Sequence, residues 1–152
     1  MLNCMSFYRA GHACYIKHIP ILPALLKYVG FLVFNSVIPP TAEIGKQSKC
    51  AYGGIGCVIH ARAVIGERVV IGQNTTIGRS LDPEDFPTIG DDVYISAGAR
   101  IIGNISVGNN VIVGANAVVN KSVPDNSIVA GVPAKVIRTV DKSIWDLLKN
   151  MY

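Results

Sequence analysis

Aliphatic residues recur at every sixth position over a long stretch of this chain. Between residues 89 and 119 they stand at Ile89, Ile95, Ile101, Val107, Val113 and Val119. A six-residue period does not keep residues on one face of a helix, whose period is about 3.6. It fits a coil with three flat sides of about six residues each, every side sending one aliphatic residue inward. A single turn cannot bury these residues alone, so the sequence predicts stacked turns around a continuous core.

The repeat begins near Ile38 and is interrupted twice before it becomes regular. About three extra residues are inserted within the segment 52–56, and a longer segment, 79–88, separates Ile77 from Ile89. The longer segment carries two prolines and three acidic residues, which predicts a solvated loop. Because a regular coil presents a similar surface at every turn, we expect function at these two irregularities.

The segments on either side of the repeat differ from it, so we expect three parts. These are an N-terminal helical cap over residues 1–35, a repeat domain over residues 36–138 and a C-terminal helix over residues 139–152. Asp141 is expected to cap the C-terminal helix. Caps at both ends are expected because an open coil exposes unpaired strand edges.

The N-terminal part predicts two helices rather than coil turns. Residues 7–15 and the apolar run over residues 25–34 flank Pro20 and Pro23. Lys27 and the prolines argue against a spanning helix, which needs about 20 mainly apolar residues. We expect the helices to pack on the coil or on a neighbouring subunit. Weak contact with a membrane surface is the alternative.

Composition narrows the functional classes. Only 16% of residues are charged and the net charge is +4, with no basic run or aromatic RNA-reading motif, so nucleic-acid binding is not expected. A mild positive charge suits an anionic ligand. The four cysteines form no C-x-x-C pair, and we expect them to be reduced core residues of a cytoplasmic protein.

Several segments resemble the hexapeptide-repeat acyltransferases. They are the Ile-Gly repeats, residues 95–103 and 113–119, and the tail over residues 129–137, which contains Gly-Val-Pro-Ala-Lys. The chain is similar to serine O-acetyltransferases and to the related O-acetyltransferases of bacterial polysaccharide synthesis. The resemblance covers roughly residues 38–138. It implies an all-β fold, a left-handed parallel β-helix that forms a homotrimer, with acetyl-CoA bound in the groove between two subunits.

Transfer of acetyl from a thioester to an alcohol needs a base for the hydroxyl proton and a donor for the developing oxyanion. Histidine suits the base, because its side chain titrates near neutral pH. Of the three histidines only His60 lies in the repeat, at the position after an inward Ile where the neighbouring six-residue units carry Gly66 and Gly72. We expect His60 to be the general base. A solvated corner histidine is the alternative.

The resemblance to serine acetyltransferases has a departure. It implies an Asp-His pair and a second histidine at positions that Ala51-Tyr52 and Phe86 hold here. The segment 52–60, Tyr-Gly-Gly-x-Gly-x-Val-Ile-His, instead matches the polysaccharide type. We therefore expect O-acetylation of a sugar or polysaccharide precursor by direct transfer.

Other functions remain open. They are serine O-acetylation, N-acetylation of a sugar nucleotide and a non-catalytic scaffold. A γ-class carbonic anhydrase would need three zinc-binding histidines, and the repeat offers one, so no metal is expected.

The resemblance also implies residues for the two substrates. For CoA these are Ser96, Ala97, Gly98, Gly114 and Ala115 along the pantetheine arm, with Lys121, Lys135 and Arg138 at the phosphates. Tyr52 is expected to position the acceptor, and a packed aromatic is the alternative. Asp82 and Asp85 are expected to orient the imidazole or to bind acceptor hydroxyls, with solvated loop charges as the alternative.

Overall fold

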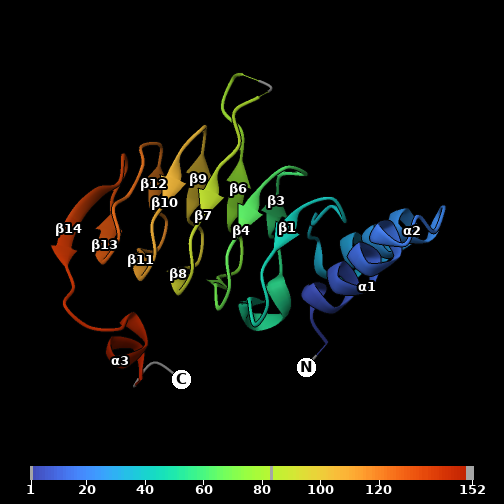
Figure 1. Ribbon diagram of the computed structural model, residues 1–152, viewed down its shortest axis with the longest axis horizontal. Helices are drawn as coiled ribbons and strands as arrows, with labels where there is room; N and C mark the ends of the chain where they lie inside the picture. Colours follow the sequence, from blue (N-terminus) through green and yellow to red (C-terminus); the bar gives the residue numbers. More distant parts are fainter. Residues whose placement is uncertain (1, 83, 150–152) are drawn as a thin grey trace.

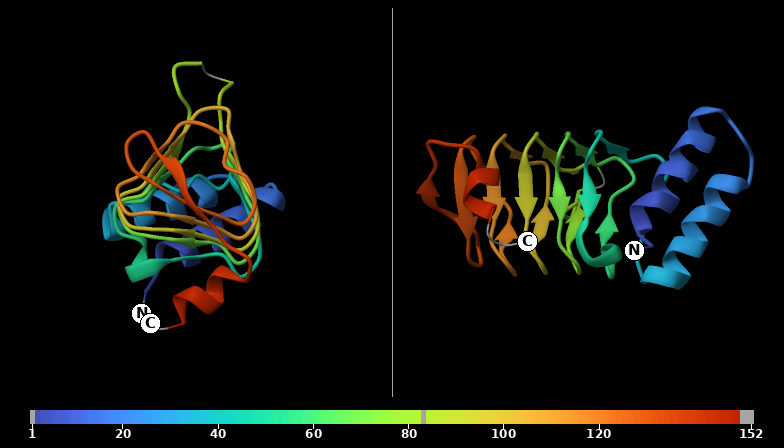
Figure 2. Two further views of the ribbon diagram at one scale, coloured as in Figure 1. Left: turned by 90° about the vertical axis from the view of Figure 1, so that its left-hand side faces the viewer. Right: turned by 90° about the horizontal axis from the view of Figure 1, so that it is seen from below.

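The computed structural model describes residues 2–82 and 84–149, which form a three-sided coil of short strands (Figure 1). A hairpin of two helices lies at one end of the coil, and a short helix folds back along one side (Figure 2). Pro83 and the last three residues of the expected C-terminal helix lie outside the described residues.

The strands form three sheets, one on each side of the coil. The first sheet contains β1 (Glu43–Ile44), β4 (Val64–Ile65), β7 (Thr88–Ile89) and β10 (Ser106–Val107). The second contains β2 (Lys49–Cys50), β5 (Val70–Ile71), β8 (Val93–Ile95), β11 (Val111–Val113), β13 (Ser127–Ala130) and β14 (Lys135–Thr139). The third contains β3 (Val58–Ile59), β6 (Thr76–Gly78), β9 (Arg100–Ile102) and β12 (Val118–Val119). Neighbouring strands are parallel except β13 and β14, which are antiparallel.

Most sides of the coil send two residues inward, not the single residue that the six-residue period predicts. The aliphatic residues of the period are buried, as the sequence analysis expects; Ile101 is fully buried. A second buried column lies two residues earlier, with Ala99 before Ile101 and Ala63 before Ile65. Residues two apart in an extended chain point to the same face. The six-residue search missed this column because its members are small and chemically mixed.

The corners of the coil explain the recurring Ile-Gly pair. A Cβ atom added to Gly90 would lie 2.5 Å from Oδ1 of Asn109 and 2.9 Å from the carbonyl carbon of Gly108. These residues belong to the corner stacked above Gly90. Only a residue without a side chain allows the two backbones to approach so closely.

The helices α1 (Cys4–Ile16) and α2 (Leu22–Phe34) close the N-terminal end of the coil (Figure 2). Asn3 caps α1 by accepting a hydrogen bond from the Met5 N–H at 3.0 Å. The Tyr8 hydroxyl donates to the Ala42 carbonyl at 2.7 Å, and the Tyr8 and Phe34 side chains join the coil's core. Helix α2 begins before the predicted residue 25, because Pro23 is accommodated in a first turn, where its missing N–H costs no hydrogen bond.

The C-terminal helix α3 (Ile144–Leu148) begins after Ser143, whose hydroxyl accepts from the Trp145 N–H at 3.3 Å. The predicted cap, Asp141, is therefore wrong, because the helix starts further along the chain. No helix within the described residues is long and apolar enough to cross a bilayer. All four cysteines are free, and Cys4, Cys50 and Cys57 are buried.

Candidate functional site

The corners of the coil fall into three rows, because each turn visits the sheets in the same order. We call the corners from first to second sheet the first row, those from second to third sheet the second row, and those from third to first sheet the third row. The first irregularity forms the short helix η1 (Ala51–Gly54) in the second row. The loop over residues 79–87 projects from the third row (Figure 2).

His60 lies in the third row, directly after β3 and beside the projecting loop. Its ring stacks on Phe86, with centroids 6.3 Å apart and an angle of 8° between the planes. The guanidinium of Arg62 lies 4.5 Å from the Phe86 ring centroid and pairs with Glu84 at 2.6 Å. The loop is thus attached to the corner by contacts of Phe86 with the imidazole and with Arg62, and by the ion pair of Arg62 with Glu84.

The backbone beside His60 favours one tautomer of its ring. The Arg62 N–H donates to Nδ1 at 3.2 Å. A neutral imidazole that accepts at Nδ1 carries its proton on Nε2. In this arrangement Nε2 is a hydrogen-bond donor, and Nδ1 holds the basic lone pair. To take a proton, the ring must release the Arg62 N–H, so that either Nδ1 reaches the acceptor or the proton moves to Nδ1 and frees Nε2.

The two loop aspartates make their described side-chain bonds within the loop. Asp82 Oδ1 accepts from the Glu84 N–H at 2.9 Å, and Asp85 accepts from the Ser80 hydroxyl. Within the described chain neither carboxylate bonds to His60. The loop thus carries an exposed carboxylate, Asp82, and a half-buried one, Asp85, without the predicted orienting contact to the imidazole.

Tyr52 does not share a corner with His60. It lies in the second row with a φ of 50° and a side chain that is 64% exposed. It lines a pocket of about 460 Å³ on the outer face of the second sheet, together with Cys50, Ala51, Val70, Trp145 and Leu148. Within one chain, His60, the predicted base, and Tyr52, a predicted acceptor-binding residue, therefore lie on different edges of the coil.

Part of the predicted CoA set lines one groove. This groove has a volume of about 540 Å³ and follows the second row and the outer face of the third sheet. Ala97, Gly98 and Ala115 line it, beside Gly56 and Asn74. Small side chains here leave room for an extended ligand along the groove. Ser96 and Gly114 belong to the same corners but do not line the groove.

The predicted basic residues lie apart from one another. Lys121 follows β12 in the third row, whereas Lys135 and Arg138 are exposed on β14. The sequence analysis missed Arg100, the cation that does line the groove. Its guanidinium donates to the carbonyls of Asn74 and, at 2.9 Å, Gly98. Its outward position in β9, paired with Thr76, is the signal that could have identified it.

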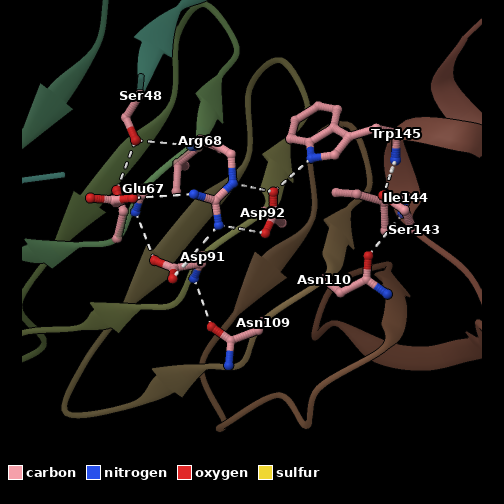
Figure 3. Close-up of polar contacts among 12 residues, drawn as sticks. Ser48, Glu67, Arg68, Asp91, Asp92, Asn109, Asn110, Ser143, Ile144 and Trp145 are labelled. Atoms are coloured by element: carbon pink, nitrogen blue, oxygen red, sulfur yellow. Dashed lines mark hydrogen bonds and ion pairs between the residues drawn. The ribbon is translucent and has the colours of Figure 1, made fainter. Parts of the chain in front are cut away.

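A second polar cluster, in the first row, attaches α3 to the coil (Figure 3). Arg68 donates to both Asp92 oxygens at 2.8 Å, and the Trp145 indole N–H donates to Asp92 Oδ1 at 2.9 Å. The hydrogen bond from Arg68 is the main reason that the pKa of Asp92 lies below its ordinary value; burial opposes it, and the Trp145 bond adds a smaller lowering. The Ile144 N–H donates to Oδ1 of Asn110 at 2.8 Å. The sequence analysis did not identify this cluster, although Arg68, Asp92 and Asn110 are 24 and 18 residues apart, both multiples of the six-residue period.

The thiols of Cys4, Cys50 and Cys57 are grouped in the core near the first irregularity. Hydrogen bonding among these neighbours and burial raise the pKa of the Cys50 thiol. Such a thiol stays protonated and unreactive. Among the described residues no group of three or more His, Cys, Asp or Glu side chains is arranged to hold a metal ion.

Comparison with known proteins agrees with the repeat. Residues 86–121 match the family model for the bacterial transferase hexapeptide, six repeats. A serine acetyltransferase of Synechococcus elongatus is 35% identical over 132 residues, which are 86% of this chain and 54% of that protein. A serine acetyltransferase of Bacillus pumilus is 34% identical over 145 residues, 94% of this chain and 66% of that protein. The chain thus spans between about half and two thirds of the length of these relatives.

Solved structures show the same similarity in three dimensions. The serine acetyltransferase of Brucella abortus superposes with a TM-score of 0.85 at 33% identity, covering 90% of this chain and 56% of that one. A serine acetyltransferase in complex with CoA gives 0.80 at 33% identity, covering 88% and 55%. With the three parallel sheets, these neighbours confirm the expected left-handed parallel β-helix with flanking helices. They do not support the expected likeness to polysaccharide-synthesis enzymes, and they fit the alternative, serine acetyltransferase, better.

Proposed function

We propose that this chain, which belongs to the hexapeptide-repeat transferases, moves acetyl from acetyl-CoA to the hydroxyl of a small acceptor, with serine the first acceptor to test. The observation that carries the proposal is the groove over the third sheet, lined by Ala97, Gly98 and Ala115. It occurs in a chain with a structural neighbour that was solved with CoA. The pantetheine arm would lie along these small residues, whose side chains leave room for it.

Arg100 and the three predicted basic residues are proposed to receive the phosphates of CoA. Arg100 already lies in the groove, although its guanidinium bonds to corner carbonyls. The other three, Lys121, Lys135 and Arg138, lie on surfaces outside the groove. They would attract the phosphates at a distance, or contact CoA that is bound to a neighbouring subunit. Their individual contributions are expected to fall with rising salt, because exposed charges are screened.

His60 is proposed to take the acceptor's hydroxyl proton. Phe86 stands where the resemblance implies the second histidine of serine acetyltransferases, and here the His60 ring stacks on that residue. An imidazole is thus present beside this position, supplied by a different part of the chain. The base role requires the ring to leave the Arg62 N–H, and binding of an acceptor beside the loop would supply a new partner.

A homotrimer is proposed to complete the site. In one chain His60 and Tyr52 lie on different edges of the coil, as do Lys121 and the groove. A neighbouring subunit packed against a flat side would bring a third-row edge of one chain to a second-row edge of the next. In that arrangement Tyr52, Asp82 and Asp85 could reach one acceptor. A cytoplasmic location stays a prediction.

A sugar hydroxyl is the second candidate acceptor. Serine acetyltransferase relatives favour serine, but Ala51-Tyr52 and Phe86 depart from the residues that the resemblance implies for it. An acceptor-binding site with an exposed tyrosine and two loop carboxylates would suit a polyol. Both candidates use the same groove for CoA, so they differ only in the acceptor.

The test is release of free CoA thiol from acetyl-CoA with serine, sugar nucleotides or oligosaccharides, each against a no-acceptor control. Faster release with serine, and O-acetylserine as the product, is the expected result. Release only with a saccharide would move the assignment to the second candidate. An amine-bearing sugar nucleotide as sole acceptor would indicate N-acetylation, and no release with any acceptor, together with no CoA binding, would leave a scaffold.

A further inference from the structure

The helical hairpin carries a line of apolar side chains that the coil does not cover. Leu22, Leu25, Tyr28 and Leu32 follow one another along one side of α2, at the spacing that places residues on one helix face. Ile19 and Ile21 extend the line into the connection between α1 and α2. We call these six residues the hairpin patch. Tyr28 is 62% exposed, Leu32 79% and Ile21 81%, so the patch faces away from the core.

The patch ends in a strained residue. Ile21 has a φ of 69°, in the left-handed region that β-branched residues rarely adopt. Its side chain is mostly exposed, so core packing does not hold it there. Strain kept at a surface residue is typical of sites that contact something else. Helix α2, the outer helix of the hairpin, lies at the end of the molecule and away from the projecting loop (Figures 1 and 2).

The charges around the patch have one sign. Residues 1–42 contain three basic residues, Arg9, Lys17 and Lys27, and no aspartate or glutamate. Arg9 is occupied by the carbonyls of Ile44 and Gly45. Lys17 is exposed beside the connection, and Nζ of Lys27 lies 5.7 Å from the Tyr28 ring centroid. The hairpin therefore combines exposed apolar side chains with two cations and no carboxylate to neutralise them.

We propose that the hairpin patch docks on the surface of an anionic lipid bilayer. Apolar side chains of such a face enter the boundary between headgroups and acyl chains, and lysines at its border attract anionic headgroups. A tyrosine suits this boundary, because its ring is amphipathic. The described helices are too short to span a bilayer, so the hairpin lies on it.

A second copy of this chain is a weaker occupant for the patch. A two-fold contact would join the same surface of both copies. It would set Lys17 and Lys27 opposite the same cations, and the hairpin has no carboxylate with which to pair them. An anionic surface complements both the apolar residues and the charges.

The experiment is cosedimentation of the full chain with phosphatidylcholine vesicles, with or without phosphatidylserine. Binding is expected to be strong only with phosphatidylserine and to weaken as salt is raised, because the electrostatic part is screened within a Debye length. The measurement does not depend on enzymatic activity, so it stands apart from the proposed acetyl transfer.

Two variants test the two parts of the patch. The double variant Ile21→Asn, Leu32→Asn should lower the vesicle partition coefficient on the order of ten-fold. Residue 21 has a φ of 69° and a ψ of −47°, so thermal melting must show that the double variant keeps the fold, and Leu32→Asn alone, in a regular helix, should lower the partition coefficient in the same direction. In the double variant Lys17→Gln, Lys27→Gln, the ratio of binding to vesicles with phosphatidylserine over binding to vesicles without it should fall on the order of ten-fold.

Leu81→Asn is the matched control. Leu81 is 100% exposed in the projecting loop, away from the hairpin, and its replacement should leave vesicle binding unchanged. Equal binding to both kinds of vesicle, no binding to either, or equal loss in the Leu81 variant would each overturn the proposal. Self-association that the Ile21, Leu32 variant abolishes, without vesicle binding, would assign the patch to a second copy instead.

Discussion

At the scale of single residues, His60 holds the most informative position in the coil. It stands where the next turn has Gly78, and its ring packs on Phe86 from the projecting loop. A glycine at this corner could supply neither the stacking nor the ring nitrogens. The sequence identifies His60 as a candidate, because it is the only histidine in the repeat. It does not predict the contact with Phe86, because that contact depends on how the loop folds back.

Replacing His60 with alanine should lower turnover about 100-fold or more, the usual contribution of a positioned acid or base. The measurement is the initial rate of thiol release at saturating acetyl-CoA. His18→Ala is the matched control, because His18 is exposed in the connection between α1 and α2, and it should retain the full rate. An unchanged rate in the His60 variant would remove this residue from the proton transfer.

At the scale of elements, the short strands derive their stability from the inward columns. Ile101 and Ile102 are neighbours in β9, yet the first is fully buried and the second is only partly so. The sequence predicted the inward position of Ile101 from its place in the six-residue period. It could not predict the second column, where alanine and valine alternate with polar residues such as Thr75.

Ile101→Ala should therefore lower the free energy of unfolding by about 2–5 kcal/mol, through lost burial and the cavity left behind. Ile102→Ala, in the same strand, should cost clearly less. Equilibrium denaturation with urea measures both. Equal losses in the two variants would mean that the neighbouring side of β9 is buried in the assembled protein.

Asp92 makes the charged link between helix α3 and the coil, beside an apolar cluster in which Ile144 and Leu148 are buried. Its carboxylate accepts from Arg68 and from the indole of Trp145, the only tryptophan in the chain. Because the folded-state pKa of Asp92 is lowered, its contribution to stability is present above the ordinary carboxyl pKa of 3.8 and is lost as pH falls through the lower folded value. The fluorescence of Trp145 should report this loss directly.

Acid titration should shift Trp145 fluorescence below pH 3.8 as α3 loosens, while the coil's circular dichroism changes less. Asp92→Asn should place the fluorescence near its loosened value already at neutral pH, because the amide cannot retain both charge-assisted bonds. Asp141→Asn is the control, since Asp141 makes no side-chain bond within the described chain. If the acid titration curve of the Asp92 variant matched that of the unmodified protein, the fluorescence transition would belong to another titrating group.

At the scale of the whole molecule, the distribution of candidate residues over different edges argues for assembly. No single corner of the described chain holds all the proposed groups, and flat sides offer broad surfaces for packing. Light scattering should therefore give a mass three times the 16.2 kDa of one chain. A monomer at micromolar concentration that still transferred acetyl would show that one coil suffices and that Tyr52 has no part in the site.

The overall architecture was the part most accessible from sequence. A strict period specifies which residues face inward, and this fixes strands, corners and sheets together. Handedness came only from resemblance, because the period is the same for either hand. The α3 attachment was not accessible, since Arg68, Asp92 and Trp145 come from separate turns and a helix, and no local pattern links them.

The antiparallel strand β14 has a consequence for how copies of this protein can associate. A coil of repeating turns could in principle grow into a filament by stacking the end of one copy on the next. At one end the helical hairpin blocks such growth. At the other, β14 runs against the direction of β13, so an incoming parallel strand would find the opposite polarity. Growth of the second sheet by stacking a parallel strand on β14 is therefore blocked, and the flat sides remain as surfaces through which copies can associate.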